Sequence, residues 1–302
     1  MANTFLTPTL IARQALATLY ETTVAARCVH RDYEPDFQSK QGLTVNVRKP
    51  ATFTAEEFDR SVGINVQNAT ETSIPVVLNH FADVSFAVTA EELSLKIENF
   101  AEELLNPALE AIAQKIDRDV LAARDDIVQE VGVAGSTTTG VDGTNKYDAD
   151  NPRVAIDARR VLNKRKVPST DRFLLVGPNI EADWLGDDLF NRADARGDTD
   201  GLREASLGRR VFGFDPYQTQ NINDDPEIGI AFHRSAIALV TRPLALPRGA
   251  KEAAVQDYKG FGIRVVFDYD IDKKQDVCSV DCLYGVKTMD ANRAVLITEG
   301  AS

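Results

Sequence analysis

The sequence lacks the surplus of basic residues that a nucleic-acid-binding domain uses against phosphates. Its 302 residues include 34 Lys and Arg and 46 Asp and Glu, so the formal net charge is −12. This balance excludes a basic nucleic-acid binder. The acidity lies in residues 1–150, which hold 12 basic and 23 acidic side chains, whereas residues 151–302 hold 22 and 23.

Long apolar runs are also missing. No stretch comes near the roughly 20 apolar residues that cross a bilayer. Residues 1–12 have neither the basic start nor the long apolar stretch of a signal peptide. We therefore expect a soluble protein that is made inside the cell and has no membrane partner.

Cysteine is scarce, and the chain contains only Cys28, Cys278 and Cys282. Three cysteines cannot all pair with one another, and nothing in their spacing suggests a disulfide framework. Because free cysteine is among the residue types most often buried, we expect all three to be small core side chains.

Motifs of enzyme active sites are absent as well. Gly135–Gly140 has the glycine spacing of a phosphate-binding loop, but Val141 and Asp142 stand where such a loop needs Lys and Ser or Thr. Adjacent acids such as Asp125 and Asp126 point in different directions and make poor acid–base pairs. The three histidines have no serine nucleophile in a strand-to-helix elbow. The sequence predicts no enzyme, no catalytic residue and no cofactor.

Three alternating acids, Asp268, Asp270 and Asp272, resemble the start of a calcium-binding loop. Such a loop needs Gly at its sixth position and Glu at its twelfth, where this chain has Lys273 and Ser279. We therefore expect surface charges on the polar side of a hairpin, and no metal site. An acidic cytosolic metal-dependent hydrolase that uses these three acids is the alternative from another class of function.

The N-terminal region has little material for a core of its own. An amphipathic helix is expected over residues 7–20, with Thr7 as its N-cap and Pro8 at the first helical position. Residues 33–73 follow with one short alternating strand at 43–47 and few large aliphatic side chains. Loops longer than about 15 residues are uncommon inside compact domains. Both segments therefore suggest contacts with other copies of the chain.

A long strand and a long helix come next. Apolar residues alternate over 74–88, which predicts one long strand. His80 lies among the apolar residues of this strand, and we expect it to make an ordinary hydrogen bond. Helical periodicity runs over 91–131 and is interrupted by Pro107. Because proline is favoured at the first position of a helix, we expect the main helix at 106–130.

The second half contains shorter elements. Gly132–Gly143 is rich in Gly, Ser and Thr and is expected to be an exposed loop near the start of a second domain. A helix is expected after Asn151 and Pro152, which repeat the pattern of a cap followed by proline. The remaining pattern predicts a helix at 179–185 and strands at 173–176, 228–232, 236–240, 263–271 and 278–286.

Three segments resemble those of a known family. Residues 201–217 read GLREASLGRRVFGFDPY and resemble the Leu-Arg-Glu, Gly, Gly-Phe-Asp and Tyr signature of tailed-bacteriophage major capsid proteins. Residues 231–243 and 281–286 resemble coat-protein segments of the Hong Kong type fold, in the branch that includes the Salmonella podophage coats. The order of amphipathic arm, core-poor excursion, long strand and long helix is similar to that family's N-terminal arm, extended loop and spine helix.

This resemblance implies a mixed α+β capsid fold. Relatives in this branch can carry an extra inserted domain, for which residues 197–225 are too short. Lys40 and Lys49 lie in or near the extended loop, but no acceptor or catalytic acid is identified, so we do not predict covalent cross-linking and leave that question open. The implied division is an N-terminal arm at 1–38, an extended loop at 39–73, a peripheral domain with the spine helix at 74–135, an axial domain at 136–240, and a return to the peripheral domain with C-terminal strands at 241–302.

The resemblance also implies a function. The chain would be a major capsid protein that assembles in the host cytoplasm into the icosahedral head of a tailed bacteriophage and resides in the virion. Its partners would be further copies of itself in hexamers and pentamers, with scaffolding, portal and decoration proteins. The shell would enclose double-stranded DNA without sequence-specific binding, which a charge of −12 suits. The alternative within the same fold is the shell of a cellular encapsulin-like nanocompartment.

Overall fold

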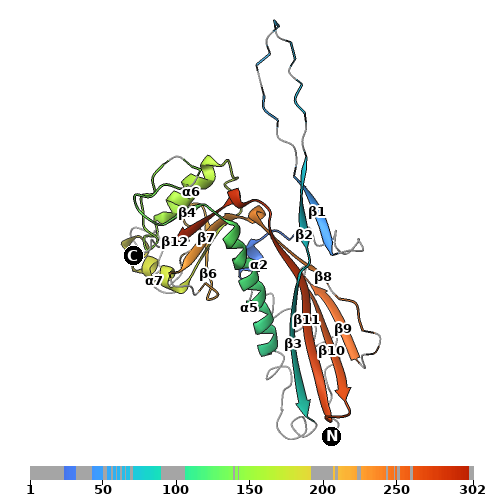
Figure 1. Ribbon diagram of the computed structural model, residues 1–302. Helices are drawn as coiled ribbons and strands as arrows, with labels where there is room; N and C mark the ends of the chain where they lie inside the picture. Colours follow the sequence, from blue (N-terminus) through green and yellow to red (C-terminus); the bar gives the residue numbers. More distant parts are fainter. Residues whose placement is uncertain are drawn as a thin grey trace.

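The computed structural model describes residues 24–31, 43–89, 106–191 and 207–298, with short gaps inside the last three of these ranges. Its strands form a long sheet, a second sheet beside it and a two-stranded ribbon that projects beyond both (Figure 1). The helix expected over 7–20 lies outside the described residues. No helix within the described ranges is long and apolar enough to cross a membrane.

The long sheet has the strand order β3-β11-β10-β9, and all of its pairs are antiparallel. Alternation along the strands places Val265, Cys278, Val280 and Cys282 in the core. All three cysteines of the chain are free and buried, which confirms their expected packing role. The strands are β3 (His80–Thr89), β9 (Glu252–Tyr258), β10 (Phe261–Asp270) and β11 (Gln275–Thr288), and β8 (Ile237–Arg242) pairs with the end of β11.

Helix α5 (Asn106–Ala122) runs along the long sheet (Figure 1). Its buried side chains Leu109, Ile112 and Ile116 share one core cluster with the sheet. The helix starts where Pro107 predicts, but it ends before the expected boundary at residue 130. The chain leaves the helix through a 3-10 turn, η2 (Ala123–Asp126), because it then joins the second sheet as β4 (Glu130–Val131).

The single strand expected over 74–88 is in fact two strands. Strand β2 (Thr72–Val77) pairs with β1 (Thr44–Lys49) in the ribbon, whereas β3 belongs to the long sheet. Only Leu78 and Asn79 lie between them. The prediction was wrong because the alternation of buried residues continues across this junction, and such alternation does not reveal which strand the backbone pairs with.

The second sheet has the order β4-β12-β7-β5-β6. Strand β7 is antiparallel to β12 and β5, while the outer pairs β12/β4 and β5/β6 are parallel. Its bounds are β5 (Arg172–Val176), β6 (Asp215–Gln218), β7 (Ile228–His233) and β12 (Ala294–Thr298), with 3-10 turns η3 (Arg234–Ala236) before β8 and η4 (Ala291–Arg293) before β12. The strands expected in this half of the sequence are all present, with small shifts at their ends.

A second core cluster lies between this sheet and its helices. The helices are α6 (Val154–Lys164), α7 (Pro178–Gly186) and α8 (Asp188–Asn191). Trp184 on α7 is fully buried, and its Nε1 donates to the main-chain oxygen of Ala149 at 2.8 Å. The buried carboxylate of Glu227 accepts the free main-chain N–H groups of Asn179 and Ile180 and so caps the start of α7. The expected mixed α+β architecture is confirmed.

Residues 24–31 are packed inside the chain's own core. Helix α2 (Ala25–Cys28) contacts α5, and Ala25, Ala26 and Val29 are fully buried. His30 N donates a hydrogen bond to Ile237 O at 3.0 Å, and Leu239 N donates one to His30 O at 2.9 Å. The main chain of His30 is therefore bonded to the residues on both sides of Ala238. This segment is therefore fixed to β8 and α5 before the chain enters the ribbon.

One carboxylate holds the start of α2 in place. Asp117 on α5 is 2% exposed, and its Oδ2 accepts hydrogen bonds from Val24 N and Asn221 Nδ2, both at 3.3 Å. Its Oδ1 is buried and has no partner among the described residues. Burial raises the pKa of Asp117 above its ordinary value of 3.8. Burial first, and then the charge of Asp117, raise the pKa of the nearby Cys28 thiol to about 12.

These observations predict how Asp117→Asn changes stability with pH. Because the pKa of Asp117 is higher in the folded state than in the unfolded state, the folded protein binds a proton at a higher pH than the unfolded chain does. The contribution of Asp117 to the free energy of unfolding therefore increases as pH falls from the raised pKa toward 3.8. The Asp117→Asn variant keeps an oxygen for Val24 N and has no charge to bury. We expect thermal unfolding to show this variant to be at least as stable as wild type at pH 7, and its advantage to shrink steadily at lower pH.

The matched control is Asp125→Asn, which removes an exposed charge from η2. It should leave the pH dependence of the melting temperature unchanged. A difference between Asp117→Asn and wild type that is constant with pH would contradict the burial of an ionised carboxylate at this position.

Candidate assembly surfaces

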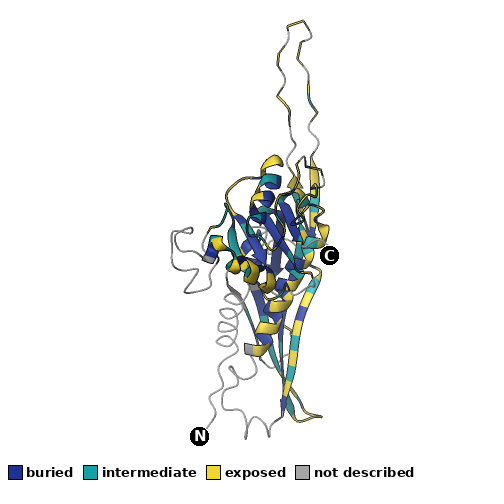
Figure 2. Cartoon of the chain, turned by 90° about the vertical axis from the view of Figure 1, so that its left-hand side faces the viewer, coloured by how far each residue is buried: buried dark blue, intermediate teal, exposed yellow. Residues whose placement is uncertain are grey.

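The ribbon formed by β1 and β2 leaves the body of the molecule. The two strands pair in antiparallel register from Thr44 opposite Val77 to Lys49 opposite Thr72. Beyond them the chain continues outward and returns (Figures 1 and 2). Thr54 and Gln67 join the two sides, with Thr54 N donating to Gln67 Oε1 at 3.0 Å and Gln67 Nε2 donating to Thr54 O at 2.5 Å.

Large apolar side chains on this excursion are exposed. The exposed fractions are 63% for Phe53, 65% for Phe58, 83% for Ile64 and 81% for Val66. Exposed apolar residues gathered on one segment mark contact surfaces in soluble proteins. The low content of large aliphatic side chains in residues 33–73 predicts that this segment contacts other copies of the chain instead of joining its own core. The exposure of these four side chains agrees with that prediction.

The base of the ribbon rests against β11. Val45, Val76 and Leu78 form a small buried cluster with Val240 of β8. At Gly285 on β11, a Cβ atom would lie 2.1 Å from the main-chain oxygen of Val77. Only glycine permits this approach, so Gly285 sets how the ribbon leaves the sheet.

The three acids that resemble a calcium loop lie at the turn between β10 and β11. Asp270 Oδ1 accepts Asp272 N at 3.0 Å and Lys273 N at 3.3 Å, which closes the turn. Asp268 Oδ1 accepts the neighbouring Tyr269 N at 2.9 Å. In the described ranges no group of three His, Cys, Asp or Glu residues is arranged to hold a metal ion. The geometry at this turn is that of a capped hairpin and does not favour the hydrolase alternative.

The histidines occupy three separate places. His80 stacks on Tyr284 with ring centroids 5.3 Å apart, and its Nδ1 lies 3.4 Å from Asp119 Oδ2. The same carboxylate accepts the hydroxyl of Tyr284, and burial followed by this hydrogen bond raises the pKa of Tyr284. His80 thus has the partner expected for a structural histidine, and the group ties α5 to β3 and β11. His233 contacts Ser235 Oγ at 2.8 Å, and His30 pairs with β8 through its main chain.

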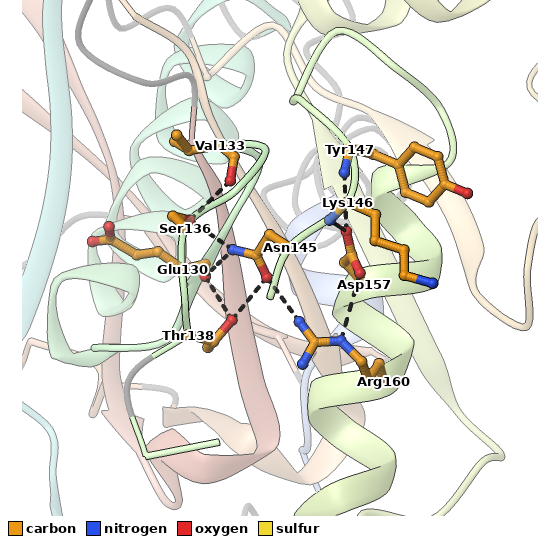
Figure 3. A network of polar contacts seen from close by, with 9 residues as sticks. All are labelled: Glu130, Val133, Ser136, Thr138, Asn145, Lys146, Tyr147, Asp157 and Arg160. Carbon is orange, nitrogen blue, oxygen red and sulfur yellow. Dashed lines mark hydrogen bonds and ion pairs between the residues drawn. The ribbon is translucent and has the colours of Figure 1, made fainter. Parts of the chain in front are cut away.

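The segment expected to be an exposed loop at Gly132–Gly143 is partly buried and tied to α6 (Figure 3). Asn145 Oδ1 accepts Thr138 Oγ1 at 3.0 Å and Arg160 Nη2 at 2.8 Å, while Asn145 Nδ2 donates to Ser136 Oγ at 3.0 Å. Thr138 is 4% exposed. The expectation is correct for Ala134, Gly135, Thr137, Gly140 and Gly143, which are exposed, and wrong for Gly132, Thr138 and Val141, which are buried. Thr138 finds partners in β4 and, through Asn145, in α6, which composition does not show.

The same network uses the hydroxyl groups of the false phosphate-loop motif. Thr138 Oγ1 lies 3.2 Å from Glu130 O, and Ser136 Oγ donates to Val133 O at 2.8 Å (Figure 3). On α6, Asp157 Oδ2 accepts Lys146 N at 2.6 Å. The hydroxyl groups of Ser136 and Thr138 are therefore bonded to the protein's own main chain.

Comparison with known proteins identifies the family. Residues 78–277 match the phage capsid protein family. The chain belongs to that family. No curated protein matches the sequence at a significant level.

Several solved structures share this fold. The structure from Mycobacterium phage Che8 has a TM-score of 0.67 and 21% identity, with 91% of this chain and 90% of that chain covered. The mature capsid of bacteriophage PhiM1 has a TM-score of 0.60 and 13% identity, with 87% of this chain and 83% of that chain covered. A virus-like particle from Pyrococcus furiosus has a TM-score of 0.51 and 12% identity, with 95% of this chain and 97% of that chain covered. At these identities the likeness establishes the fold, and the family establishes a capsid protein.

The close approach at Gly285 gives a test of how the ribbon is oriented. Replacement by Ala forces β11 and Val77 apart, and overpacking of this kind costs about 1 to 3 kcal/mol. We expect Gly285→Ala to fold with a lower free energy of unfolding in urea, and its shells to assemble poorly. Gly186→Ala is the control, because a Cβ there meets nothing within 4 Å. Equal stability of the two variants would show that Gly285 does not fix the base of the ribbon.

Proposed function

We propose that this capsid protein is the major capsid protein of a tailed bacteriophage, which forms hexamers and pentamers and tiles an icosahedral head around double-stranded DNA. The observation that carries the proposal is the projecting ribbon, whose apolar side chains Phe53, Phe58, Ile64 and Val66 are exposed in the single chain. A neighbouring copy supplies the missing contact, and repetition by symmetry supplies it to every copy. The net charge of −12 keeps the inner wall from gripping packaged DNA.

The division into regions is part of the same proposal. Residues 1–38 form the arm, 39–73 the extended loop, and 74–135 with 241–302 the peripheral domain around the long sheet. Residues 136–240 form the axial domain. Support comes from the two large core clusters: one joins the long sheet to α2 and α5 and extends to β5, β7 and β12, and the other lies between the second sheet and α6 and α7. Strand β12 pairs with β7, so we assign it to the axial domain sheet although it follows in the C-terminal part of the chain.

The finer assignment is to the Salmonella podophage coat-like branch. It rests on the three sequence segments in 201–217, 231–243 and 281–286. With it we propose assembly in the host cytoplasm, residence in the virion, and scaffolding, portal and decoration proteins as partners. A cellular nanocompartment is the second candidate, and the match of residues 78–277 to the phage capsid protein family favours the phage head.

Ile64→Asp tests the ribbon as an assembly element. The side chain is 83% exposed in the single chain, so the variant should fold with an unchanged far-ultraviolet circular dichroism spectrum. Burying an Ile side chain contributes about 1.5 to 3 kcal/mol. Loss of this contact should therefore lower the association constant between two copies at least tenfold. Size-exclusion chromatography and negative-stain microscopy should find monomers or capsomers instead of shells.

Ala55→Asp is the matched control, because it adds the same charge to the same exposed segment without removing a large apolar side chain. Shells should form from this variant in nearly normal yield. If Ile64→Asp assembles as well as Ala55→Asp does, the ribbon does not join neighbouring copies.

A further inference from the structure

A pocket lined by three arginines lies beside the second sheet, away from the ribbon. Its walls are Arg159 on α6, Ser169 in the loop before β5, Arg172 at the start of β5, and Arg210 and Gly213 before β6. Its volume is about 260 Å³. Two of the arginines belong to segments that are about fifty residues apart in sequence. Arg210 and Gly213 come from the capsid-like signature in 201–217, to which the proposed assembly assigns no task.

Arg172 forms the rigid floor of this pocket. It is 2% exposed, and its guanidinium donates from Nε to Pro168 O at 2.7 Å and from Nη2 to Asn163 Oδ1 at 2.8 Å and Val167 O at 2.7 Å. These bonds occupy one edge of the guanidinium and fix its plane. Nη1 makes no hydrogen bond within the described part of the chain, and its two N–H groups are left for a ligand.

The other two arginines are anchored by main-chain oxygens. Arg159 Nη1 donates to Phe212 O at 3.1 Å, and Arg210 Nη2 donates to Ser169 O at 3.2 Å. Both residues are otherwise exposed. None of the three arginines forms an ion pair with a carboxylate of the described residues, although the chain has 46 acids. Among the described residues, three positive charges therefore meet without a compensating carboxylate.

The backbone around the pocket is held in an unfavourable conformation. Phe212 has φ of 48° and Gly213 φ of 91°, and a Cβ at Gly213 would lie 3.3 Å from Arg159 Nη1. Asp171, next to Arg172, has φ of 50°. Positive φ at residues other than glycine costs free energy and is concentrated at ligand sites. At Phe212 this conformation aims the carbonyl at Arg159 and so places that guanidinium at the pocket.

Electrostatics favour an anion of more than one charge. Burial, and then the positive charge of Arg159, lower the pKa of Arg172, which reports the repulsion between the two side chains. One carboxylate would neutralise one of three charges. A phosphate-type oxoanion carries more charge on several oxygens, and guanidinium groups bind such oxygens with paired N–H donors.

We propose that this pocket binds a multivalent phosphate anion, held by Arg172 Nη1 at the floor and by Arg159 and Arg210 at the rim. Free polyphosphate and the triphosphate group of a nucleotide share this chemistry. Because each copy carries the pocket, bound phosphate also removes the repulsion between the three arginines in every subunit and should stabilise the fold.

The test is isothermal titration calorimetry of the purified full chain with tripolyphosphate at constant ionic strength. Wild type should bind about one anion per chain with a raised melting temperature. Arg159→Gln and Arg210→Gln should each weaken the binding of tripolyphosphate about tenfold. Arg210→Lys keeps the charge without the paired donors, so its affinity should lie between those of the Gln variants and wild type. Arg118→Gln removes an exposed arginine from α5 and should bind as wild type does.

The comparison ligands separate the sources of the anion. ATP that binds as tightly as tripolyphosphate, with AMP much weaker, would assign the site to the triphosphate group. Absence of binding, equal weakening by Arg118→Gln, or acetate that binds as tightly as tripolyphosphate would overturn the proposal. In the last case the pocket would be a carboxylate site that a neighbouring acidic copy fills. Circular dichroism of each variant confirms folding, which the exposure of Arg159 and Arg210 leads us to expect.

Discussion

Strand β11 is the element on which the rest of the structure depends. Its 14 residues pair with β3 along one edge and, along the other, with β10 and then with β8. One of its faces is covered by α5, and its glycine admits the carbonyl of Val77 at the base of the ribbon. The pairing of three neighbouring strands and the direction of the ribbon are thus fixed by a single stretch of chain. A change in β11 therefore affects both the core and the assembly surface.

Much of this framework could be predicted from the sequence where one local pattern decides the structure. The alternation of Cys278, Val280 and Cys282 predicts a strand with a buried face, and Pro107 predicts the start of α5, because both depend only on neighbours in sequence. The division between β2 and β3 was not predictable in this way. The same alternation serves both strands, and the choice of pairing partner depends on β1 and β11, which lie far away in the chain.

The polar contacts were the least predictable part. Asn145 meets Arg160, and Asp117 meets Val24, across 15 and 93 positions of sequence. The arginine pocket likewise combines α6 with loops before β5 and β6. No composition or period marks such residues, because what makes them partners is the fold itself. The exposed apolar side chains of the ribbon differ from these polar residues, because the sequence does distinguish them. They follow neither the strand period nor the helix period that marks core residues.

The junction of β2 and β3 has a mechanical consequence. The ribbon and the long sheet share one nearly continuous length of extended chain, with only Leu78 and Asn79 between the two sets of hydrogen bonds. Leu78 is buried, and its N–H is bonded to Leu43 O, so this short connection has little freedom to swivel. A sideways load on the tip of the ribbon is therefore transmitted as torque to β3 and β11. In the closed lattice proposed above, each subunit's sheet would then experience strain from the neighbour that its ribbon contacts.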